Sequence, residues 1–510
     1  MKMAPSRALR SAIIRLFSRD ARTITASLCS SCNHQARRSI NILPDPPQNA
    51  LDKTALDPIT AMNSRGLIAE VSSRDAPRAL VKNPTAAYAG FDPTASSLHV
   101  GNLMLILSLI HFQLLGHQPI ALVGGATGSI GDPSFRSTER TVMQHDTVHT
   151  NTAKITAQLQ SIFEKSQLYL NRRALDKGWF QLPPDGMKPV KVLNNLDWFK
   201  DMKLLEFLGF AGRQARISTM LARDSVKSRL QSQTGLSFTE FTYQLLQAYD
   251  FLYLNTNHSC TVQLGGTDQW GNITAGVDMI RKRNLDVPEA ERSNIPAFRR
   301  KVYGIVVPLV VNSQGEKFGK SAGNAMWLDS EMLSPFDFFQ FFKKTADADV
   351  EKYLKYFTFV PLPLIQQVME EHQSSPSKQI PQRILASEVT ELVHGEEESR
   401  KAIIMTDVLY DSTEKYKPAE IISAFQSSPH FTSLPYDQVV GKSIIDVAVA
   451  TGALPTKKGT RRCIAENALS LGFRKITTPE HIVSVDDTME GKLILLRVGK
   501  PKYRVVELVS

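Results

Sequence analysis

From Ala86 onwards, apolar segments and turn signals predict strands and helices in alternation. Residues 86–91 are predicted as a strand, 98–115 as a helix ended by Gly116, and 119–123 as a second buried strand. Strand, helix and strand at this spacing form a βαβ unit, which implies a parallel sheet with ligands at the carboxyl ends of its strands. The alternation continues with a helix over 237–254, a strand over 262–264, a helix over 269–282 and a strand over 302–311.

The pattern changes on either side of this region. Residues 48–84 are predicted as a short helical lead-in, best over 61–71. From Pro335 to about residue 430 strand patterns disappear, and helical patterns such as 384–393 dominate between prolines. Residues 438–510 are predicted as a helix, a turn, a basic helix over 460–469, and two strands over 493–498 and 503–508 that a hairpin turn joins.

The composition is that of an ordinary globular protein, because 42% of the 510 residues are hydrophobic and 22% are charged. That length predicts two to four domains. No run approaches the roughly 20 apolar residues of a membrane span, since the longest candidate, 103–115, is interrupted by Ser108, His111 and Gln113. We therefore expect no membrane association.

The net charge of +10 is concentrated at the two ends. Residues 1–44 carry +7, residues 441–510 carry +5, and the middle carries −2. The first segment is rich in Arg, Ser and Thr, and its apolar residues fall on one helical face, which is typical of a mitochondrial transit peptide. A flexible basic RNA-binding arm is the alternative. Cys29 and Cys32 lie in this segment, so the remaining two cysteines indicate neither a disulfide framework nor a zinc site.

A first cluster of polar residues follows the first predicted strand, in the segment Tyr88-Ala-Gly-Phe-Asp-Pro-Thr-Ala-Ser-Ser-Leu-His-Val-Gly-Asn102. The helix begins near Leu98, and the unpaired N–H groups at its start favour an anion. His99 and Asn102 share a face of the first turn, and Gly101 lets a flat ring or a phosphate approach the backbone. A capped core helix with two polar residues is the alternative interpretation.

A second cluster lies in the loop 312–323 after the last predicted strand, with the sequence Gly315-Glu-Lys-Phe-Gly-Lys-Ser321. Two lysines three residues apart on a glycine-containing loop suit the clamping and release of a polyphosphate. Most loops of this pattern are solvated surface, so the segment decides nothing by itself. Neither a GxxxxGK[ST] phosphate loop nor a kinase signature is present.

Together the two clusters resemble the HIGH and KMSKS signatures of class I aminoacyl-tRNA synthetases. Residues 123–133, 238–250 and 263–272 resemble the tyrosyl-tRNA synthetases, and the likeness runs from about residue 85 to 410 and more loosely to the end. It implies an ATP-dependent tyrosine–tRNA ligase of bacterial type in the mitochondrial matrix. The expected architecture is α/β. The predicted segments are 1–44 (transit peptide), 45–84 (N-terminal extension), 85–334 (Rossmann-like catalytic domain), 335–435 (helical anticodon-side domain) and 436–510 (basic α+β RNA-binding domain).

The resemblance implies a tyrosine pocket whose polar groups recognise the phenol. Tyr88 and Asp250 match the family positions that donate to and accept from the hydroxyl, and a site built in this way rejects the analogue that lacks it. Tyr243, Gln247 and Asp250 are spaced at i, i+4 and i+7 on one helical face. The substrate ammonium is expected among Asp132, Tyr243, Gln247 and Gln263.

The resemblance also implies the ATP side. Attack of the tyrosine carboxylate on the α-phosphorus needs no general base, so catalysis is positioning and stabilisation of charge. ATP with Mg²⁺ is expected as substrate, with no protein-held metal and no tightly bound cofactor. The implied catalytic residues are Thr94, His99, Asn102, Lys317 and Lys320, and the implied ATP contacts are Asp92, His99, Gly101, Gly266, Asp268, Gln269, Lys317 and Lys320.

The sequence departs from the family pattern at several places. Asn102 stands for the second histidine of HIGH, although its amide can still donate, and Phe318-Gly319 stand for Met-Ser. Residues 166–192 are longer and less regular than expected, and a solvated insertion is the simplest interpretation.

The implied partners are tRNA(Tyr), tyrosine, ATP and a second copy of the chain, since Phe238 matches a position at the family's dimer interface. RNA contacts are expected from Arg136, Arg140, Lys457, Lys458, Arg461 and Arg462, largely to phosphates. A charged solvated face is the alternative for the C-terminal residues. A rival function is folding of group I intron RNA through 45–84 and 166–192. A tryptophanyl enzyme is disfavoured because Tyr88 and Asp250 suit a phenol.

Overall fold

The computed structural model describes residues 57–82, 84–134, 143–231, 235–287, 295–321, 324–411, 415–499 and 502–509. The predicted transit peptide lies outside these ranges, as do Arg136 and Arg140. Within them, no helix is both long enough and apolar enough to cross a membrane.

A six-stranded sheet forms the centre of the first half of the chain, in the order β1-β6-β5-β2-β3-β4. Five strands are parallel, and β1 (Glu70–Val71) is antiparallel to β6. The parallel sheet predicted from the βαβ pattern is therefore confirmed. The parallel strands are β2 (Ala86–Phe91), β3 (Gln118–Val123), β4 (Lys191–Asn194), β5 (Cys260–Gly266) and β6 (Tyr303–Val307).

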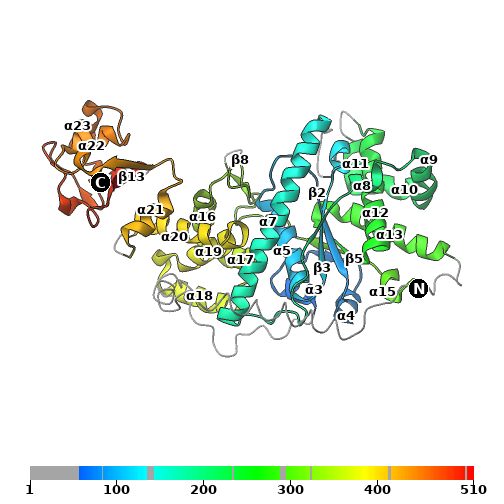
Figure 1. Cartoon of the computed structure of the whole chain (residues 1–510). Coiled ribbons are helices and arrows are strands. Elements are labelled where there is room, and N and C mark those ends of the chain that lie inside the picture. Colours follow the sequence, from blue (N-terminus) through cyan, green and yellow to red (C-terminus); the bar gives the residue numbers. More distant parts are fainter. Residues whose placement is uncertain are drawn as a thin grey trace, which may run out of the picture. The chain divides into compact units, whose positions relative to one another are not determined.

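Helices cover both faces of this sheet (Figure 1). On one face lies α5 (Val100–Leu114), which is almost wholly apolar and ends before Gly116, whose φ of +82° suits glycine. On the other face α12 (Phe238–His258) and α13 (Trp270–Asp286) pack against side chains such as Ile120 and Leu122. Shorter helices are α4 (Ala76–Lys82), α6 (Thr127–Ile130), α8 (Leu196–Phe199), α9 (Leu204–Phe207), α10 (Ile217–Leu221), α11 (Asp224–Leu230) and α15 (Ala297–Arg300).

The predicted lead-in helix over 61–71 is wrong in its extent. The helix is α3 (Pro58–Ser64), which begins earlier because the Asp57 side chain caps it and proline occupies its first turn. It ends before Gly66, which has a φ of +76°. The last two residues of the predicted helix form β1 instead.

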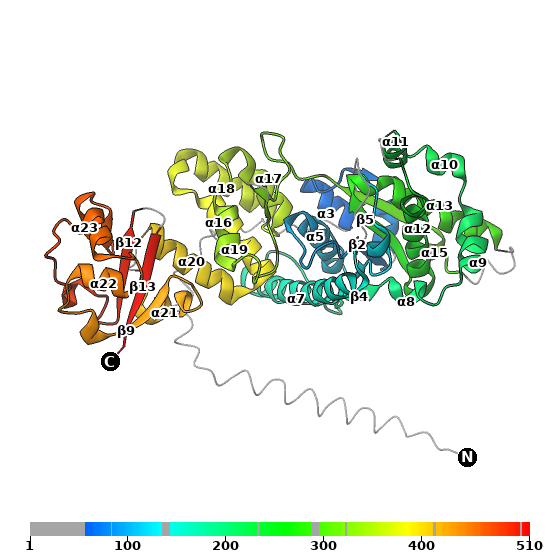
Figure 2. The same ribbon diagram turned by 90° about the horizontal axis from the view of Figure 1, so that it is seen from above.

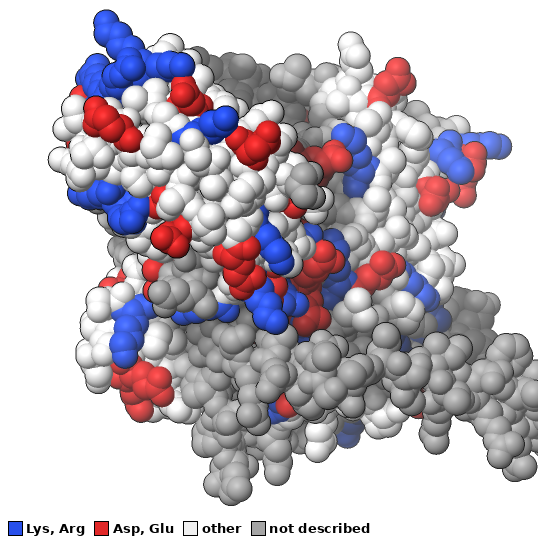
Figure 3. Space-filling view, turned by 60° about the vertical axis from the view of Figure 1, so that its left-hand side comes forward, with Lys and Arg blue, Asp and Glu red and all other residues white. Residues whose placement is uncertain are grey.

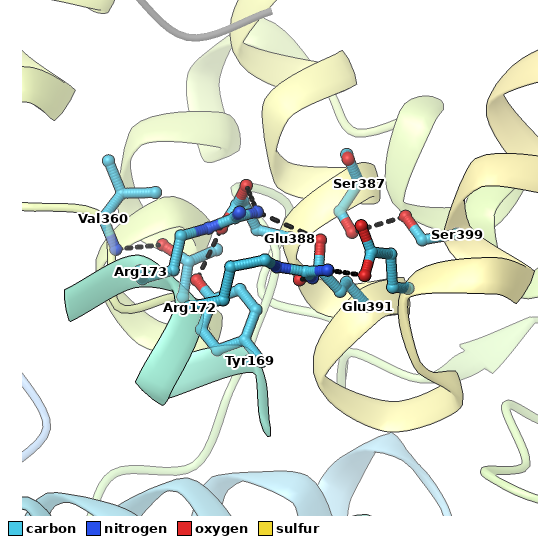
Figure 4. Close-up of polar contacts among 10 residues, drawn as sticks. Tyr169, Arg172, Arg173, Val360, Ser387, Glu388, Glu391 and Ser399 are labelled. Atoms are coloured by element: carbon cyan, nitrogen blue, oxygen red, sulfur yellow. Dashed lines mark hydrogen bonds and ion pairs between the residues drawn. The ribbon is translucent and has the colours of Figure 1, made fainter. Parts of the chain in front are cut away.

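The prediction that residues 166–192 are a solvated insertion is wrong for their first part, 166–179, whereas in 180–192 only Met187 is buried. Residues 166–192 begin inside α7 (His145–Lys177), a helix of 33 residues. Tyr169, Leu170 and Trp179 are all almost completely buried. One side of α7 is buried against a helix more than 200 residues further along the chain (Figure 4).

After the sheet the chain is helical, as predicted. Its prolines begin helices, because a proline in the first turn costs no hydrogen bond. The helices are α16 (Pro335–Lys343), α17 (Asp347–Phe357), α18 (Leu362–Ser374), α19 (Ile380–His394), α20 (Glu396–Tyr410) and α21 (Pro418–Phe425).

The C-terminal sheet has the order β11-β10-β12-β13-β9. The predicted strands and their antiparallel pairing are confirmed as β12 (Leu493–Val498) and β13 (Lys502–Val509). The basic helix is α23 (Lys457–Ala465), earlier than the predicted 460–469, because Thr456 caps it and residues 469–471 form β10. One face of the sheet packs on α22 (Ile444–Ala450) and α23, and the other on α20 and α21. The remaining strands are β9 (Phe431–Pro435), parallel to β13, and β11 (Arg474–Lys475).

Candidate active site

A cavity of about 450 Å³ opens at the carboxyl ends of the parallel strands. Asp92 follows β2, Gly124 follows β3 and Asp268 follows β5, and all three line it. This is the edge of the sheet at which the sequence predicted a ligand site.

One end of the cavity is a narrow polar pocket inside the apolar core. Tyr243, Gln247 and Asp250 of α12 line it together with Tyr88 of β2 and Gln263 of β5. The hydroxyl oxygen of Tyr88 and the amide oxygens of Gln247 and Gln263 are buried and have no hydrogen-bond partner among the described residues. Buried polar atoms are normally paired, so this pocket suits a ligand that supplies the partners.

Asp250 is held by two donors that the sequence analysis did not identify. Nδ2 of Asn195 donates to Oδ2 at 3.1 Å, and the indole Nε1 of Trp198 donates to Oδ1 at 2.9 Å. Burial raises the pKa of Asp250 to about 8, although both hydrogen bonds act to lower it. Asn195 directly follows β4 beside β3, so its place after a parallel strand was the signal that could have revealed it.

Carboxylates surround the mouth of this pocket. The Tyr243 hydroxyl donates to Asp92 at 2.8 Å, and Nε2 of Gln269 donates to Asp132 at 2.6 Å and to Asp268 at 3.1 Å. Burial, and then the charge of Asp92, raise the pKa of Tyr243 well above its ordinary value. This arrangement favours a cation, such as an ammonium group, between the pocket and the strand ends.

The HxGN segment forms the N-terminus of α5 as a reciprocal cap. The Gly101 N–H donates to Nδ1 of His99, and the His99 N–H donates to the side-chain oxygen of Asn102, both at 3.0 Å. Because Nδ1 accepts, the neutral ring carries its proton on Nε2. A Cβ on Gly101 would lie 2.7 Å from the His99 ring, so this glycine is also needed for the histidine's own position. Thr94, His99, Gly101, Asn102 and Gly266 all line the cavity.

Lys317 of the lysine loop does not line this cavity. Burial raises the pKa of Asp268, which does line it, and the charge of Lys317 acts to lower that pKa. Lys317 lines a neighbouring cavity of about 620 Å³ with residues of α16 and α17. Phe318 lines both cavities, and its ring packs on Tyr353, Phe341 and Phe357. Lys320 begins the short strand β7 (Lys320–Ser321), which pairs with β8 (Asn324–Ala325), but its side chain is outside the described part of the structure.

Of the basic residues expected to contact RNA, four are described. Lys457 pairs with Asp446, and Arg462 pairs with Glu466. Lys458 and Arg461 are exposed and form no ion pair with the residues that the structure describes. On the face drawn in Figure 3, acidic and basic side chains are interspersed and do not form fields of one sign.

A parallel sheet whose strand ends bear a polar cavity, with an HxGN turn on one side and a KxxKS loop on the other, defines the class I aminoacyl-tRNA synthetases. Comparison with family models agrees. Residues 81–410 match "tRNA synthetases class I (W and Y)", and residues 420–506 match "Tyrosine--tRNA ligase SYY-like C-terminal domain".

Individual relatives show which members of this class of synthetases the chain is similar to. The chain is 40% identical to the mitochondrial tyrosine–tRNA ligase of Drosophila melanogaster, over 86% of this chain and 91% of the relative. It is 40% identical to the chloroplastic/mitochondrial enzyme of Arabidopsis thaliana, over 89% and 83%. A C-terminally truncated mitochondrial tyrosyl-tRNA synthetase of Aspergillus nidulans superposes with a TM-score of 0.62 at 35% identity, covering 69% of this chain and 94% of that one. The chain belongs to the tyrosyl-tRNA synthetases of class I, the ATP-dependent tyrosine–tRNA ligases.

Proposed function

We propose that the strand-end cavity binds tyrosine and ATP side by side and forms tyrosyl-adenylate. The observation that carries the proposal is the buried end of the pocket, where the Tyr88 hydroxyl and Asp250 lie in the core. A phenol hydroxyl can hydrogen-bond to both groups, whereas the ring of phenylalanine would leave the Tyr88 hydroxyl without a partner and would add nothing to the two donors that Asp250 already has. Leaving buried polar groups unpaired is the basis of strong discrimination, and tyrosyl-tRNA synthetases are themselves the standard example.

We assign roles to the other residues that line the cavity from the charges around them. Asp132, Tyr243, Gln247 and Gln263 are assigned to the amino acid, because acidic and amide groups at the pocket mouth favour its ammonium group. The residues nearer the strand ends are assigned to ATP: Asp92, His99, Gly101, Gly266, Asp268 and Gln269.

In the proposed reaction an oxygen of the tyrosine carboxylate bonds to the α-phosphorus of ATP, and the bond to pyrophosphate breaks. The carboxylate is ionised at neutral pH, so positioning and charge stabilisation supply the catalysis. Thr94, His99 and Asn102 are assigned to the phosphate side, and Mg²⁺ is expected to arrive with ATP. Lys317 and Lys320 would have to swing in with their loop.

The second reaction transfers the tyrosyl group to the 3′ end of tRNA(Tyr). We assign phosphate contacts with this RNA to Lys458 and Arg461, with further contacts from Lys457, Arg462, Arg136 and Arg140. We retain 85–334 as the catalytic domain and 335–435 as the anticodon-side domain. The pairing of β9 with β13 supports a start of the RNA-binding domain before residue 436.

We further propose a homodimer in the mitochondrial matrix, reached by means of residues 1–44. Phe238 is 75% exposed at the start of α12, and Leu204, Leu205 and Ile217 are more than 60% exposed. Exposed apolar side chains mark an interface where they form one patch, and Phe238 is the position that matches the family's dimer interface. Two relatives are named as organellar enzymes, which supports the location.

The activity is tested by ATP–pyrophosphate exchange with each of the twenty amino acids. Exchange with tyrosine alone is the expected result, and exchange with tryptophan or with none would overturn the proposal. One of the two supports for intron folding is weakened, because the first part of 166–192 belongs to α7 and packs one of its sides against the rest of the protein.

A further inference from the structure

The long helix α7 touches both the catalytic sheet and the helical region. Its 33 residues span about 50 Å at about 1.5 Å per residue. Figures 1 and 2 show it running beside α5 towards α19. Nothing in the proposed reaction uses this helix.

Near its start, α7 holds the turn between β2 and α5 through two amide side chains. Nδ2 of Asn151 donates to the carbonyl of Pro93 at 3.1 Å. Oε1 of Gln158 accepts from the backbone N–H of Leu98 at 2.8 Å, and its Nε2 donates to the hydroxyl of Ser97 at 3.1 Å. The first and last residues of segment 93–98 are therefore both tied to α7.

Water could not replace these hydrogen bonds, because the groups that form them are buried. Leu98 is only 3% exposed and Asn151 only 7% exposed. A backbone N–H buried without an acceptor costs the free energy of a lost hydrogen bond, so Gln158 is the group that permits this backbone path. The donor also fixes the amide orientation of Gln158, since only its oxygen can face an N–H.

The held segment carries the groups assigned to the phosphates. Thr94 lies inside it, His99 follows it directly, and both line the cavity. The Thr94 side chain is exposed, so its position depends on the backbone of 93–98, which α7 holds. The His99 side chain is also exposed and accepts from the Gly101 N–H, and the backbone on either side of His99 bonds to residues 326–328. The helix α7 therefore shares the positioning of His99 with these contacts.

At its other end α7 is anchored by a buried ion network with α19 (Figure 4). Arg173 makes two hydrogen bonds to Glu388, at 2.6 and 3.1 Å, and a third to Glu391 at 3.0 Å. Tyr169 donates to Glu388, and Arg172 pairs with Glu391 and Glu396. Anchored in this way, α7 is held against sliding along the sheet.

We propose that α7 is a strut that positions the phosphate-side turn, with Gln158 and Asn151 as positioning residues for adenylate formation. They act through Thr94 and His99 and do not touch substrate themselves. The inference rests on the proposed function, because it takes those two residues to face ATP.

The test is Gln158→Met in the full-length chain, which keeps the volume of the side chain and removes both hydrogen bonds. A displacement of about 1 Å can cost about 10²-fold in rate. We expect the kcat of tyrosine-dependent ATP–pyrophosphate exchange to fall roughly 10- to 100-fold, with the tyrosine KM within twofold of wild type. Gln160→Met is the matched control, because Gln160 is an exposed glutamine on the same helix. Gln158→Glu retains the acceptor for Leu98 and is expected to recover most of kcat.

Three outcomes would overturn the strut. One is a kcat of Gln158→Met within twofold of Gln160→Met. The second is a loss of tyrosine affinity equal to the loss of kcat. The third is failure of Gln158→Glu to recover kcat while its unfolding midpoint equals that of wild type. If Gln158→Met unfolds, Asn151→Leu replaces it under the same criteria. Absence of exchange in the wild-type protein would refute the proposed function and with it the role of α7 in adenylate formation, whereas wild-type exchange that Gln158→Met leaves intact would refute the role of α7 alone.

Discussion

The buried ion network between α7 and α19 should dominate the stability of that contact, and Arg173→Met is the change that tests it. The side chain of Arg173 is 13% exposed and that of Glu388 4% exposed. Burial by itself would lower the pKa of Arg173, but the charges and hydrogen bonds of Glu388 and Tyr169 together raise it by more, so the guanidinium stays charged. Its ring neighbours Tyr169 and Trp179, at 4.9 and 5.3 Å, add cation–π contacts.

The size of the destabilisation follows from the contacts that Glu388 loses when methionine replaces Arg173. Glu388 would remain buried with only Tyr169 as a donor among the described residues, and breaking a buried pair in this way costs about 3–5 kcal/mol. At about 2–4 °C per kcal/mol, the unfolding midpoint should fall by on the order of 10 °C. Glu388→Gln in the same chain removes the orphaned charge and keeps an acceptor for Tyr169, so the double variant should regain part of the loss.

Thermal unfolding followed by circular dichroism and calorimetry measures both effects. Lys154→Met is the matched control, because Lys154 is an exposed basic residue on the same helix, and it should change stability by less than about 0.5 kcal/mol. Equal midpoints for Arg173→Met and Lys154→Met would refute the reasoning. A double variant less stable than Arg173→Met alone would show that the cost is not the unpaired carboxylate.

Four further predictions concern the site and the termini. The pKa of Asp250, about 8 when folded against 3.8 for the free side chain, means that the folded state holds an extra proton between these pH values. Its contribution to the free energy of unfolding therefore falls as pH rises through this window, by up to about 1.4 kcal/mol per pH unit, and Asp250→Asn should flatten the slope in urea titrations; an unchanged slope contradicts this. Lys317→Ala or Lys320→Ala should lower the rate of adenylate formation in rapid-quench experiments and leave tyrosine affinity intact; weaker tyrosine binding at an unchanged rate would reverse the assignment. Lys458→Gln with Arg461→Gln should weaken tRNA binding and reduce its salt slope by about one per lost phosphate contact, with ATP–pyrophosphate exchange unaffected; an unchanged slope would remove these residues from the RNA surface. This pair is preferable to deletion of 436–510, which would strip β12 and β13 from the core they share with α20 and α21. N-terminal sequencing of the mature protein should find residues 1 to about 40 removed, and a mature form that retains Met1 or Lys2 would exclude a cleaved transit peptide.

Local patterns were sufficient for much of the fold and the pocket. β2 and β12 have the predicted bounds, because alternation and turn residues act over a few neighbours. The stripe of Tyr243, Gln247 and Asp250 was visible because helical spacing brings these side chains to one face. The parallel sheet then located the cavity at the strand ends without any knowledge of distant contacts.

The errors and omissions arise where distant segments decide a residue's surroundings. Residues 166–192 look longer and less regular than expected in the sequence, because the groups that bury Arg172 and Arg173, namely Glu388 and Glu391, lie more than 200 residues away. Trp198 reads as an ordinary aromatic until the fold brings its indole N–H to Asp250. Lys317 shows the opposite case: its motif indicates the chemistry, yet the packing of Phe318 against α16 and α17 decides which cavity the lysine lines. Sequence patterns therefore indicated which groups do the chemistry, whereas partners from distant segments determine how Asp250, Lys317 and the α7 network are held.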